Sequence, residues 1–259
     1  MKILFNTDQI HLHGGIEKVM ATKANYFAAL PEVEVYVVTT EQKNLPPRYA
    51  LDSRIKLLDL GVDYDRTKSY FSIQNLKKAK LHYQKQNALF KSLKPDVIIS
   101  PNFNFDHYWL PFIKANAKLI KERHSSRYQE EEQRQSASFL KRLKYKLSDW
   151  VEKQYHHIVV LNKDEAHYVK TGNAAVIPNP VELSSLSADI HSKKVVAAGR
   201  ISPVKNFGDL IKAWSFVKAE FPDWQLDIYG EDYLGTQATL ETQIRENGLE
   251  DVINFKGGS

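Results

Sequence analysis

Residues 195–207 read VVAAGRISPVKNF, a short apolar run followed by a glycine, two basic residues and the start of an amphipathic segment. A run of small and β-branched apolar residues predicts a strand buried in a parallel sheet. Gly199 is expected to end this strand, and Arg200 and Lys205 then lie in the loop at its carboxyl end, where open α/β sheets bind ligands. Two cations in one loop suit the oxygens of a diphosphate, and they equally suit an ordinary solvated turn.

The same alternation of short apolar runs and longer amphipathic segments extends along the whole chain. Strands are predicted at residues 3–6, 35–39, 55–60, 97–100, 118–121, 158–161, 195–198, 226–229 and 252–255. Helices are predicted at residues 16–30, 68–91, 139–155, 163–170, 207–221 and 237–247. Strands that alternate with helices predict an α/β protein with parallel sheets and right-handed crossovers.

A polar, serine-rich segment interrupts this alternation. Residues 179–188 read NPVELSSLSA, which is typical of a linker. Two domains are therefore predicted, residues 1–187 and residues 188–259. The second contains only three predicted strands, and no crossover helix follows the last of them. An uncovered strand of this kind is rare in a free-standing domain, so the second domain is predicted to be incomplete.

Composition narrows the classes of function. The chain has no cysteine, which excludes disulfides and a cysteine nucleophile and fits a reducing compartment. The first apolar run is too short for a signal peptide, and no run approaches the ~18 apolar residues of a membrane span, so a cytoplasmic protein is expected. A net charge of +5 favours acidic partners such as phosphorylated small molecules. Nucleic acid is not expected, because no recognition motif accompanies the charge.

A second glycine-containing loop follows the first predicted strand. Residues 11–19 read HLHGGIEKV, so Gly14 and Gly15 immediately precede or open a helix whose first turn holds Glu17. Glycines allow close approach of a ligand to the backbone, and a helix N-terminus favours an anion. The spacing is not that of the dinucleotide-binding G-x-G-x-x-G motif, and a tight turn explains it equally well.

A third loop of this kind reads IYGED at residues 228–232. Gly230 and Glu231 follow a predicted strand of the same sheet as Gly199. Because parallel strands end at one edge of a sheet, these residues are expected to line one crevice.

Taken in order, these loops resemble those of the retaining glycosyltransferases of family 4. The matching segments are GGIEKV at 14–19, VIPNPV at 176–181, AGRISPVKNF at 198–207, IYGE at 228–231 and GLEDVINFKG at 248–257. In the family they correspond to the acceptor-domain loop, the interdomain hinge, the diphosphate loop and the next two strands. Asn179 lies in the hinge.

The resemblance implies the GT-B fold, with two Rossmann-like parallel-sheet domains, of which the second is incomplete here. It implies a C-terminal domain that binds a nucleotide sugar, most often a UDP- or GDP-sugar, and an N-terminal domain that binds a glycan or lipid-linked acceptor. A hexose-type sugar would be transferred with retention of configuration, in surface polysaccharide or lipopolysaccharide biosynthesis. No metal or other cofactor would be required.

The resemblance also implies roles for individual residues. Arg200 and Lys205 would hold the diphosphate of the donor, and the amides of Gly14 and Gly15 would approach the same phosphates from the other domain. The remaining residues expected at the cleft are Glu17, Asn179, Gly199, Gly230 and Glu231. Fixed cations aimed at a leaving diphosphate stabilise the transition state, where its charge increases.

One family element is not found in this sequence. It is a pair of glutamates separated by seven residues, one near the transferred sugar and one on the nucleotide ribose, and it is expected beyond residue 259. The chain is therefore interpreted as C-terminally truncated. The alternative is a non-catalytic remnant, or a glycan- or lipid-binding partner with an incomplete donor site.

His124 follows the predicted strand at 118–121, in the segment KERHSS. The resemblance implies a contact with the donor sugar, so His124 is the candidate catalytic residue, able to orient a hydroxyl or relay a proton. A solvated loop histidine is the alternative.

Residues 139–150 read FLKRLKYKLSDW and predict an amphipathic helix flanked by lysine and arginine. The apolar stripe and its basic flanks suit an anionic membrane surface. Packing of the stripe against the sheet is the more common arrangement and is preferred from sequence.

A metal-dependent transferase is the enzymatic alternative. Asp63 and Asp65 have the one-residue spacing that such enzymes use to hold a divalent cation on a diphosphate. Changing both aspartates would then abolish activity.

Overall fold

The computed structural model describes residues 1–69, 71–101, 104–181 and 185–258. The chain divides into two compact units, Met1–Glu182 and Leu183–Ser259. The predicted linker at residues 179–188 spans this division, and its residues 182–184 lie outside the described residues. Each unit has its own sheet and its own apolar core, as the sequence predicts.

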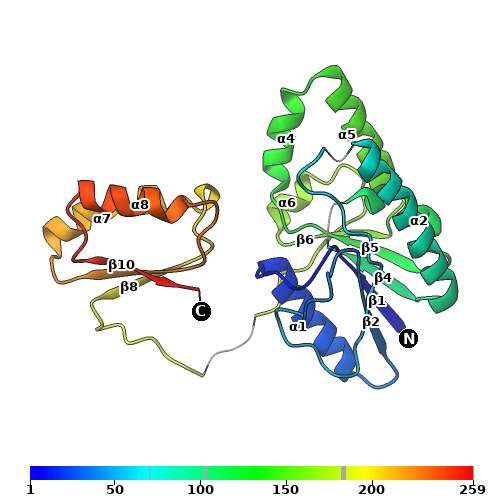
Figure 1. The fold of residues 1–259 in the computed structure, drawn as a ribbon, viewed down its shortest axis with the longest axis horizontal. Coiled ribbons are helices and arrows are strands. Elements are labelled where there is room, and N and C mark those ends of the chain that lie inside the picture. The colour runs from blue at the N-terminus through cyan, green and yellow to red at the C-terminus, as the bar shows by residue number, and fades with distance from the viewer. Residues whose placement is uncertain (70, 102–103, 182–184, 259) are drawn as a thin grey trace. The chain divides into compact units, whose positions relative to one another are not determined.

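The first unit is built on a seven-stranded sheet with the order β3-β2-β1-β4-β5-β6-β7, and every pair of neighbouring strands is parallel (Figure 1). The strands are β1 (Lys2–Asn6), β2 (Glu34–Thr39), β3 (Lys56–Asp59), β4 (Val97–Ser100), β5 (Lys118–Glu122), β6 (His157–Val160) and β7 (Ala174–Val176). The order reverses between β1 and β4. The prediction of a parallel α/β sheet is confirmed, and the carboxyl ends of β1 and β4 mark the place where such sheets bind ligands.

Helices cover both faces of this sheet. They are α1 (Gly15–Ala29), α2 (Ile73–Leu93), α3 (Leu110–Ile113), α4 (Arg127–Gln135), α5 (Phe139–Glu152) and α6 (Lys163–His167), with a 3₁₀ helix, η1, at Phe105–Tyr108. Both faces of the sheet carry apolar side chains that must be covered. In β1, for example, successive side chains point to opposite faces. Phe5 belongs to a core cluster with Met20 of α1, whereas Leu4 belongs to a second cluster with Phe90 of α2.

Four elements of this unit are not predicted from the sequence, and η1 and α3, with four residues each, are two of them. Strand β7 has three residues, too few for a periodic pattern. Helix α4 reads RYQEEEQRQ and has no apolar stripe. Its conformation is supported by ion pairs, because the Arg134 guanidinium lies 2.8 Å from Glu130 and 2.7 Å from Asp149 of α5.

The start of α2 also differs from the prediction. The helix begins at Ile73 rather than at residue 68, and the Ser72 hydroxyl accepts a hydrogen bond from the Asn75 amide at 3.3 Å. The Asn75 side chain donates to the carbonyls of Asp65 and Ser69, both at 3.0 Å, and so folds the preceding residues into a turn. Side chains that bond to nearby carbonyls compete with the helix, which propensity alone does not show.

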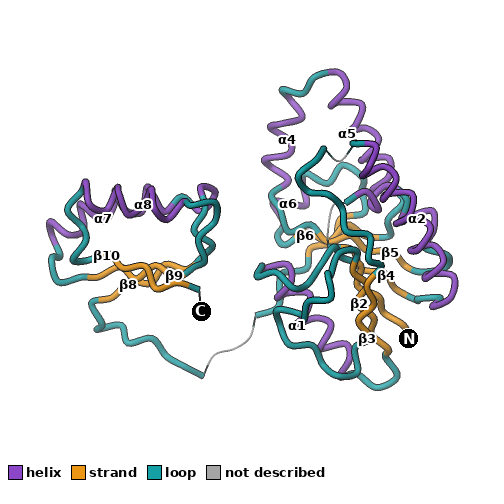
Figure 2. The backbone as a smooth tube through the Cα atoms, viewed as in Figure 1, coloured by secondary structure: helices purple, strands orange, loops and turns teal. Residues whose placement is uncertain are grey.

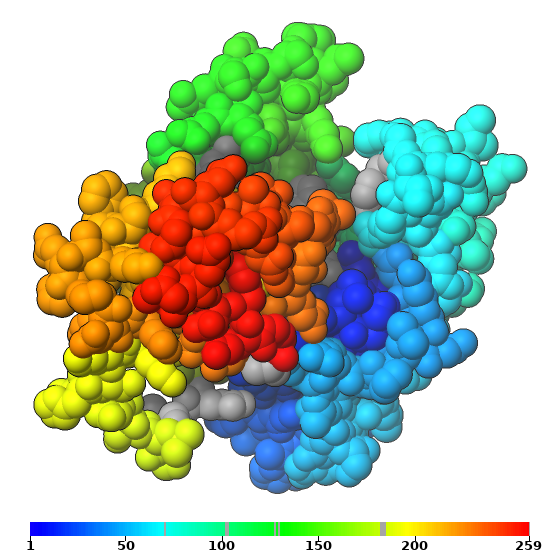
Figure 3. All heavy atoms as spheres, turned by 60° about the vertical axis from the view of Figure 1, so that its left-hand side comes forward, coloured from blue at the N-terminus to red at the C-terminus, as the bar shows by residue number. Residues whose placement is uncertain are grey.

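The preferred interpretation of the stripe on α5 is wrong. The exposed apolar side chains are Phe139, Leu140, Leu143, Leu147 and Trp150. The helix turns Ser148, Val151 and Glu152 inward instead. Helices α4 and α5 project from the sheet of the first unit, as both ribbon and space-filling views show (Figures 1 and 3, green).

The second unit has a three-stranded parallel sheet with the order β10-β9-β8 (Figure 2). Its elements are β8 (Lys194–Ala198), the 3₁₀ helix η2 (Pro203–Lys205), α7 (Phe207–Glu220), β9 (Gln225–Tyr229), α8 (Thr236–Glu246) and β10 (Ile253–Gly257). Helices α7 and α8 cover one face, where Trp214 and Ile244 share a core with Leu226. On the other face Val196 is 63% exposed, so among residues 185–258 no helix covers it.

Candidate active site

A pocket of about 530 Å³ opens at the carboxyl edge of the sheet of the first unit. Each contributing strand supplies residues just beyond its end. Asp8 and Gln9 follow β1, Glu41 follows β2, Pro101 follows β4 and His124 follows β5. The pocket therefore lies beside the reversal of strand order, which is the ligand-binding position of this class of sheet.

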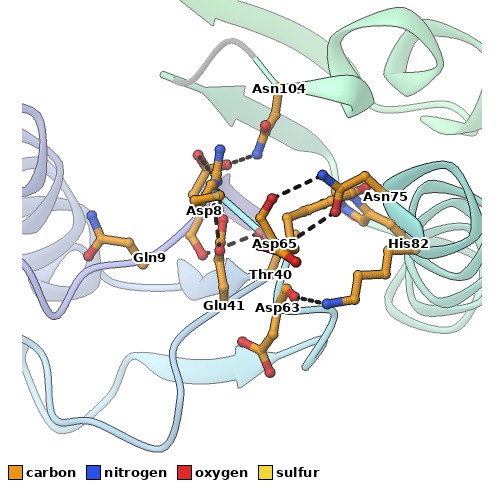
Figure 4. Close-up of polar contacts among 12 residues, drawn as sticks. Asp8, Gln9, Thr40, Glu41, Asp63, Asp65, Asn75, His82 and Asn104 are labelled. Carbon is orange, nitrogen blue, oxygen red and sulfur yellow. Dashed lines mark hydrogen bonds and ion pairs between the residues drawn. The ribbon is translucent and has the colours of Figure 1, made fainter. Parts of the chain in front are cut away.

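One wall of the pocket is an ion cluster. The Arg66 guanidinium lies 3.2 Å from an Asp8 carboxylate oxygen and forms an ion pair with Glu41, which is 5% exposed. The Asn104 side chain also donates to Asp8 (Figure 4). Arg66 comes from the loop between β3 and α2, so this contact holds that loop against the strand ends. The sequence gives no signal for it, because Arg66 and Glu41 are far apart along the chain.

The opposite wall holds His124, which lies with Glu122 at the end of β5. The Nε2 atom of His124 lies 3.3 Å from Glu122 Oε2, and the Lys23 ammonium of α1 lies 2.6 Å from both Glu122 oxygens. Burial opposes the ionisation of Glu122, but the hydrogen bond from His124 and the charge of Lys23 outweigh it and lower the pKa of this carboxyl. The sequence points to His124 but not to Glu122 or Lys23.

Glu17 lines the same pocket and folds back over the start of α1. It accepts a hydrogen bond from the Gln9 side chain at 2.7 Å. A Cβ atom on Gly14 would lie 3.0 Å from the Glu17 carboxyl carbon, whereas one on Gly15 would have no neighbour within 4 Å. Gly14 thus makes room for Glu17, whose carboxylate faces the positive end of the helix dipole.

In the second unit, the predicted residues converge at the carboxyl ends of β8 and β9. The Gly199 amide donates to the Tyr229 carbonyl and the Ile201 amide to the Glu231 carbonyl, both at 2.9 Å. A Cβ atom on Gly230 would lie 2.9 Å from the Gly199 carbonyl carbon, and it would overlap the attached oxygen. The two strand ends can therefore approach this closely only because residue 230 is glycine.

Arg200 and Lys205 both lie exposed in the loop that follows β8. The Arg200 guanidinium lies 4.6 Å from the centre of the Tyr233 ring. A Cβ atom on Gly199 would lie 3.7 Å from Lys205 Cδ, so the lysine stem passes beside this glycine. Neither cation forms an ion pair with the described residues, and Lys205 directly precedes the start of α7.

Two further predicted features do not line the pocket of the first unit. Asn179 follows β7 and is not among the residues that line the pocket of the first unit. Asp63 is exposed, in the left-handed backbone region at φ 50°, while Asp65 accepts hydrogen bonds from Thr67 and lies 3.4 Å from the Lys68 ammonium. Across the described ranges, no group of three or more acidic or histidine side chains is arranged to hold a metal ion.

Sequence comparison identifies the family. The family model of Glycosyltransferase Family 4 matches residues 13–185, and that of Glycosyl transferases group 1 matches residues 184–259. The chain belongs to glycosyltransferase family 4. The first of these matches covers the unit with the His124 pocket, and the second covers the unit with the Arg200 loop. The resemblance seen in the loops is confirmed, and the chain is a glycosyltransferase by family.

A curated relative and several solved structures are also similar to this chain. An uncharacterized glycosyltransferase of Haemophilus influenzae is 26% identical over 98% of this chain and 68% of its own length. Sucrose-phosphate synthase of Thermosynechococcus elongatus covers the whole chain with a TM-score of 0.74 at 15% identity, and the chain covers 71% of it.

The lipopolysaccharide outer core galactosyltransferase WaaB, in its apo form, matches with a TM-score of 0.64 at 15% identity, with 100% of this chain and 68% of that one covered. Anabaena HepE, in complex with UDP and glucose, matches with a TM-score of 0.61 at 17% identity, with 100% and 70% covered. These likenesses show that the fold is GT-B. No helix within the described ranges is both long and apolar enough to cross a membrane.

Proposed function

We propose that this family 4 chain transfers a hexose-type sugar from a nucleotide sugar to a glycan or lipid-linked acceptor, with retention of anomeric configuration. UDP- and GDP-sugars are the proposed donors, and no metal or other cofactor is required. The setting is surface polysaccharide or lipopolysaccharide assembly at the cytoplasmic face of the membrane. HepE, crystallised with UDP and with UDP-glucose, supports a UDP-linked donor.

The observation that carries this proposal is the loop after β8. Arg200 and Lys205 present two exposed cations beside a glycine-lined strand end, and neither is neutralised by an acidic side chain of the described residues. Lys205 also adjoins the first amides of α7, whose residue Asn206 makes no side-chain cap. Unneutralised cations next to uncapped helix amides form a site for a diphosphate.

This site acts on the leaving group. When the bond from the anomeric carbon to the diphosphate breaks, the departing oxygen gains negative charge. Arg200 and Lys205 stabilise that charge more in the transition state than in the bound donor, which accelerates the reaction. The same two charges take the place of the divalent cation that other transferases use.

The pocket of the first unit is the proposed acceptor side. Its carboxylates are already matched with cations or amides, since Arg66 holds Asp8 and Glu41 while Lys23 holds Glu122. A pocket with compensated charges and many hydrogen-bonding groups suits the hydroxyls of a sugar better than a second anion. His124, for which the resemblance implies a contact with the donor sugar, would orient a hydroxyl of that sugar.

Gly14 and Gly15 remain proposed contacts of the donor phosphates. In the present structure the Glu17 carboxylate lies over this end of α1. An anion that reaches the same amides must displace the Glu17 side chain, which requires a change of rotamer and no change of backbone.

The exposed face of α5 is the proposed membrane contact. It combines five apolar side chains with four exposed basic ones, Lys141, Arg142, Lys144 and Lys146. Phe112 of α3 extends the apolar face, since its ring stacks on Trp150 with the ring centres 5.7 Å apart. Asp149 of α5 is paired with Arg134. An apolar face with basic flanks fits an anionic lipid surface and would bring the chain to a lipid-linked acceptor.

Thermal melts with UDP, GDP, ADP and CMP and the matching sugar nucleotides test the donor proposal. We expect one base class to raise the Tm, and the variant Arg200→Ala/Lys205→Ala to lose that shift. The matched control is Lys193→Ala/Lys212→Ala, which removes two exposed lysines of the same unit whose partners are Asp223 and Asp209. Cooperative melting without any nucleotide shift would contradict the proposal and favour a non-catalytic binding protein.

A further inference from the structure

The two ring nitrogens of His124 face different surroundings. Nε2 lies 3.3 Å from the Glu122 carboxylate. Nδ1 has no hydrogen-bond partner among the described residues, and it is not completely buried. Since His124 lines the pocket, Nδ1 is the nitrogen that reaches the pocket surface.

The carboxylate of Glu122 is fixed in place beside the His124 ring. Its side chain is 9% exposed, and both its oxygens lie 2.6 Å from the Lys23 ammonium. Just beyond it, the Arg123 amide donates to the Val159 carbonyl at 2.9 Å, so the backbone between Glu122 and His124 remains paired with β6. The carboxylate and the backbone that carries the His124 ring are therefore both held in place.

An ionised carboxylate only accepts hydrogen bonds, so the ring nitrogen that faces Glu122 must carry the proton. A neutral imidazole carries one proton. With Nε2 protonated, Nδ1 has a lone pair and can only accept. A sugar hydroxyl at the pocket surface then donates to Nδ1.

We propose that Glu122 is a positioning residue, which fixes His124 in the Nε2-protonated tautomer and so presents Nδ1 to the pocket as the acceptor of a hydrogen bond from a sugar hydroxyl. This inference rests on the proposed function for the identity of the ligand and on the geometry alone for the tautomer. No other carboxylate of the pocket does this. Glu17 is bonded to Gln9, while Asp8 and Glu41 are held by Arg66.

The variant Glu122→Leu gives the sharpest test, because it keeps a side chain of similar size and removes the acceptor that faces Nε2. A glutamine would not do this, since Glu122 Oε2 lies 2.6 Å from the Lys23 ammonium and 3.3 Å from His124 Nε2, and an amide oxygen at that position accepts from both. Without an acceptor at Nε2, the ring is expected to exchange between its two neutral tautomers.

The experiment is long-range ¹H–¹⁵N correlation spectroscopy on the full chain labelled at its histidine rings, above the pH at which the ring titrates. His124→Asn assigns the His124 signals by their disappearance. We expect a single Nε2-protonated tautomer in the wild type and a mixture of both tautomers in Glu122→Leu. The matched control Glu17→Gln changes a carboxylate of the same pocket that does not contact His124, and it should leave the tautomer unchanged.

Titration with glucose, galactose and N-acetylglucosamine as probes then tests the hydroxyl. At least one sugar is expected to shift the Nδ1 resonance of the wild type, and Glu122→Leu is expected to reduce this shift while the signals of the other histidine rings stay in place. An Nδ1-protonated or mixed tautomer in the wild type, or a tautomer unchanged by Glu122→Leu, would overturn the role of Glu122. A wild-type Nδ1 resonance that no sugar moves would overturn the hydroxyl contact. Failure of the donor proposal is seen separately, in the nucleotide melts of the Arg200 and Lys205 variant.

Discussion

Gly230 and Gly199 approach each other so closely at the ends of β9 and β8 that any side chain on Gly230 would overlap the Gly199 carbonyl. The contact sets the path of the loop that carries Arg200. The geometry of the proposed diphosphate site therefore depends on a glycine at position 230.

Gly230→Ala is expected to push the two strand ends apart and to lower the free energy of unfolding by about 1–3 kcal/mol, the usual cost of overpacking. It should also abolish any rise in Tm caused by a nucleotide. Differential scanning fluorimetry with and without the nucleotide measures both effects. Gly208→Ala is the control, because a Cβ atom there meets only side-chain ends, Gln243 Oε1 at 3.3 Å and Leu240 Cδ2 at 3.8 Å. An alanine at 230 that preserves the nucleotide shift would contradict this role.

The buried ion pair between Arg123 and Glu152 is expected to matter for stability. Glu152 is fully buried and Arg123 is 9% exposed. Glu152→Ala leaves a buried guanidinium without this partner and should lower the free energy of unfolding by about 3–5 kcal/mol, as measured by urea denaturation. Lys56→Ala removes the exposed pair with Glu34 and should leave the urea midpoint nearly unchanged. Equal effects of the two variants would argue against the burial of the Arg123 pair.

His82 is expected to make stability depend on pH. Its Nδ1 lies 3.1 Å from the Tyr64 hydroxyl, and burial lowers its pKa below the ordinary 6.5, against the opposing charges of Asp106 and Glu41. The unfolded chain therefore binds this proton at a higher pH than the native chain does. The contribution of neutral His82 is fully present above about pH 6.5 and is lost as the pH falls below it.

Urea denaturation between pH 5 and pH 8 measures this dependence. His82→Gln should lower stability at pH 8 and flatten the pH dependence in the acid range. His191→Gln, at an exposed position in the second unit, is the control. An unchanged slope in His82→Gln would show that other groups cause the acid sensitivity.

The α5 face is expected to bind anionic membranes. Co-sedimentation should show binding to vesicles that contain phosphatidylglycerol and little binding to pure phosphatidylcholine, with the difference reduced by salt. Lys141→Glu/Lys144→Glu should weaken binding at least about tenfold, since each basic residue near the surface contributes about 1 kcal/mol.

Two variants make the membrane test specific. Lys77→Glu/Lys80→Glu makes the same change of charge on exposed positions of α2 and should bind more tightly than the α5 variant. Leu140→Ser/Leu143→Ser keeps the charge and should weaken binding through the apolar contact alone. Equal loss from the α2 and α5 variants would mean that net charge, and not this face, determines the binding.

The periodic pattern was sufficient to predict the parallel sheets, because buried strands and amphipathic helices leave local signals in the sequence. It missed α4, whose ion pair between Arg134 and Asp149 joins residues from two helices. It also failed on the apolar stripe of α5. A pattern shows that one face of a helix is apolar, but whether that face meets the sheet depends on where the helix is attached.

The site residues also divide into those that the sequence predicted and those that only the structure revealed. The sequence by itself determined that Gly199, Arg200, Gly230 and Glu231 follow strands of one parallel sheet, because order along the chain and strand polarity place them at one edge. Only the tertiary structure decided that Lys23 meets Glu122, that Glu122 meets His124, and that Arg66 meets Asp8 and Glu41. The physical reason is that such pairs are selected by distance and burial after the chain has folded, and residues far apart in sequence carry no local trace of the partner they will contact.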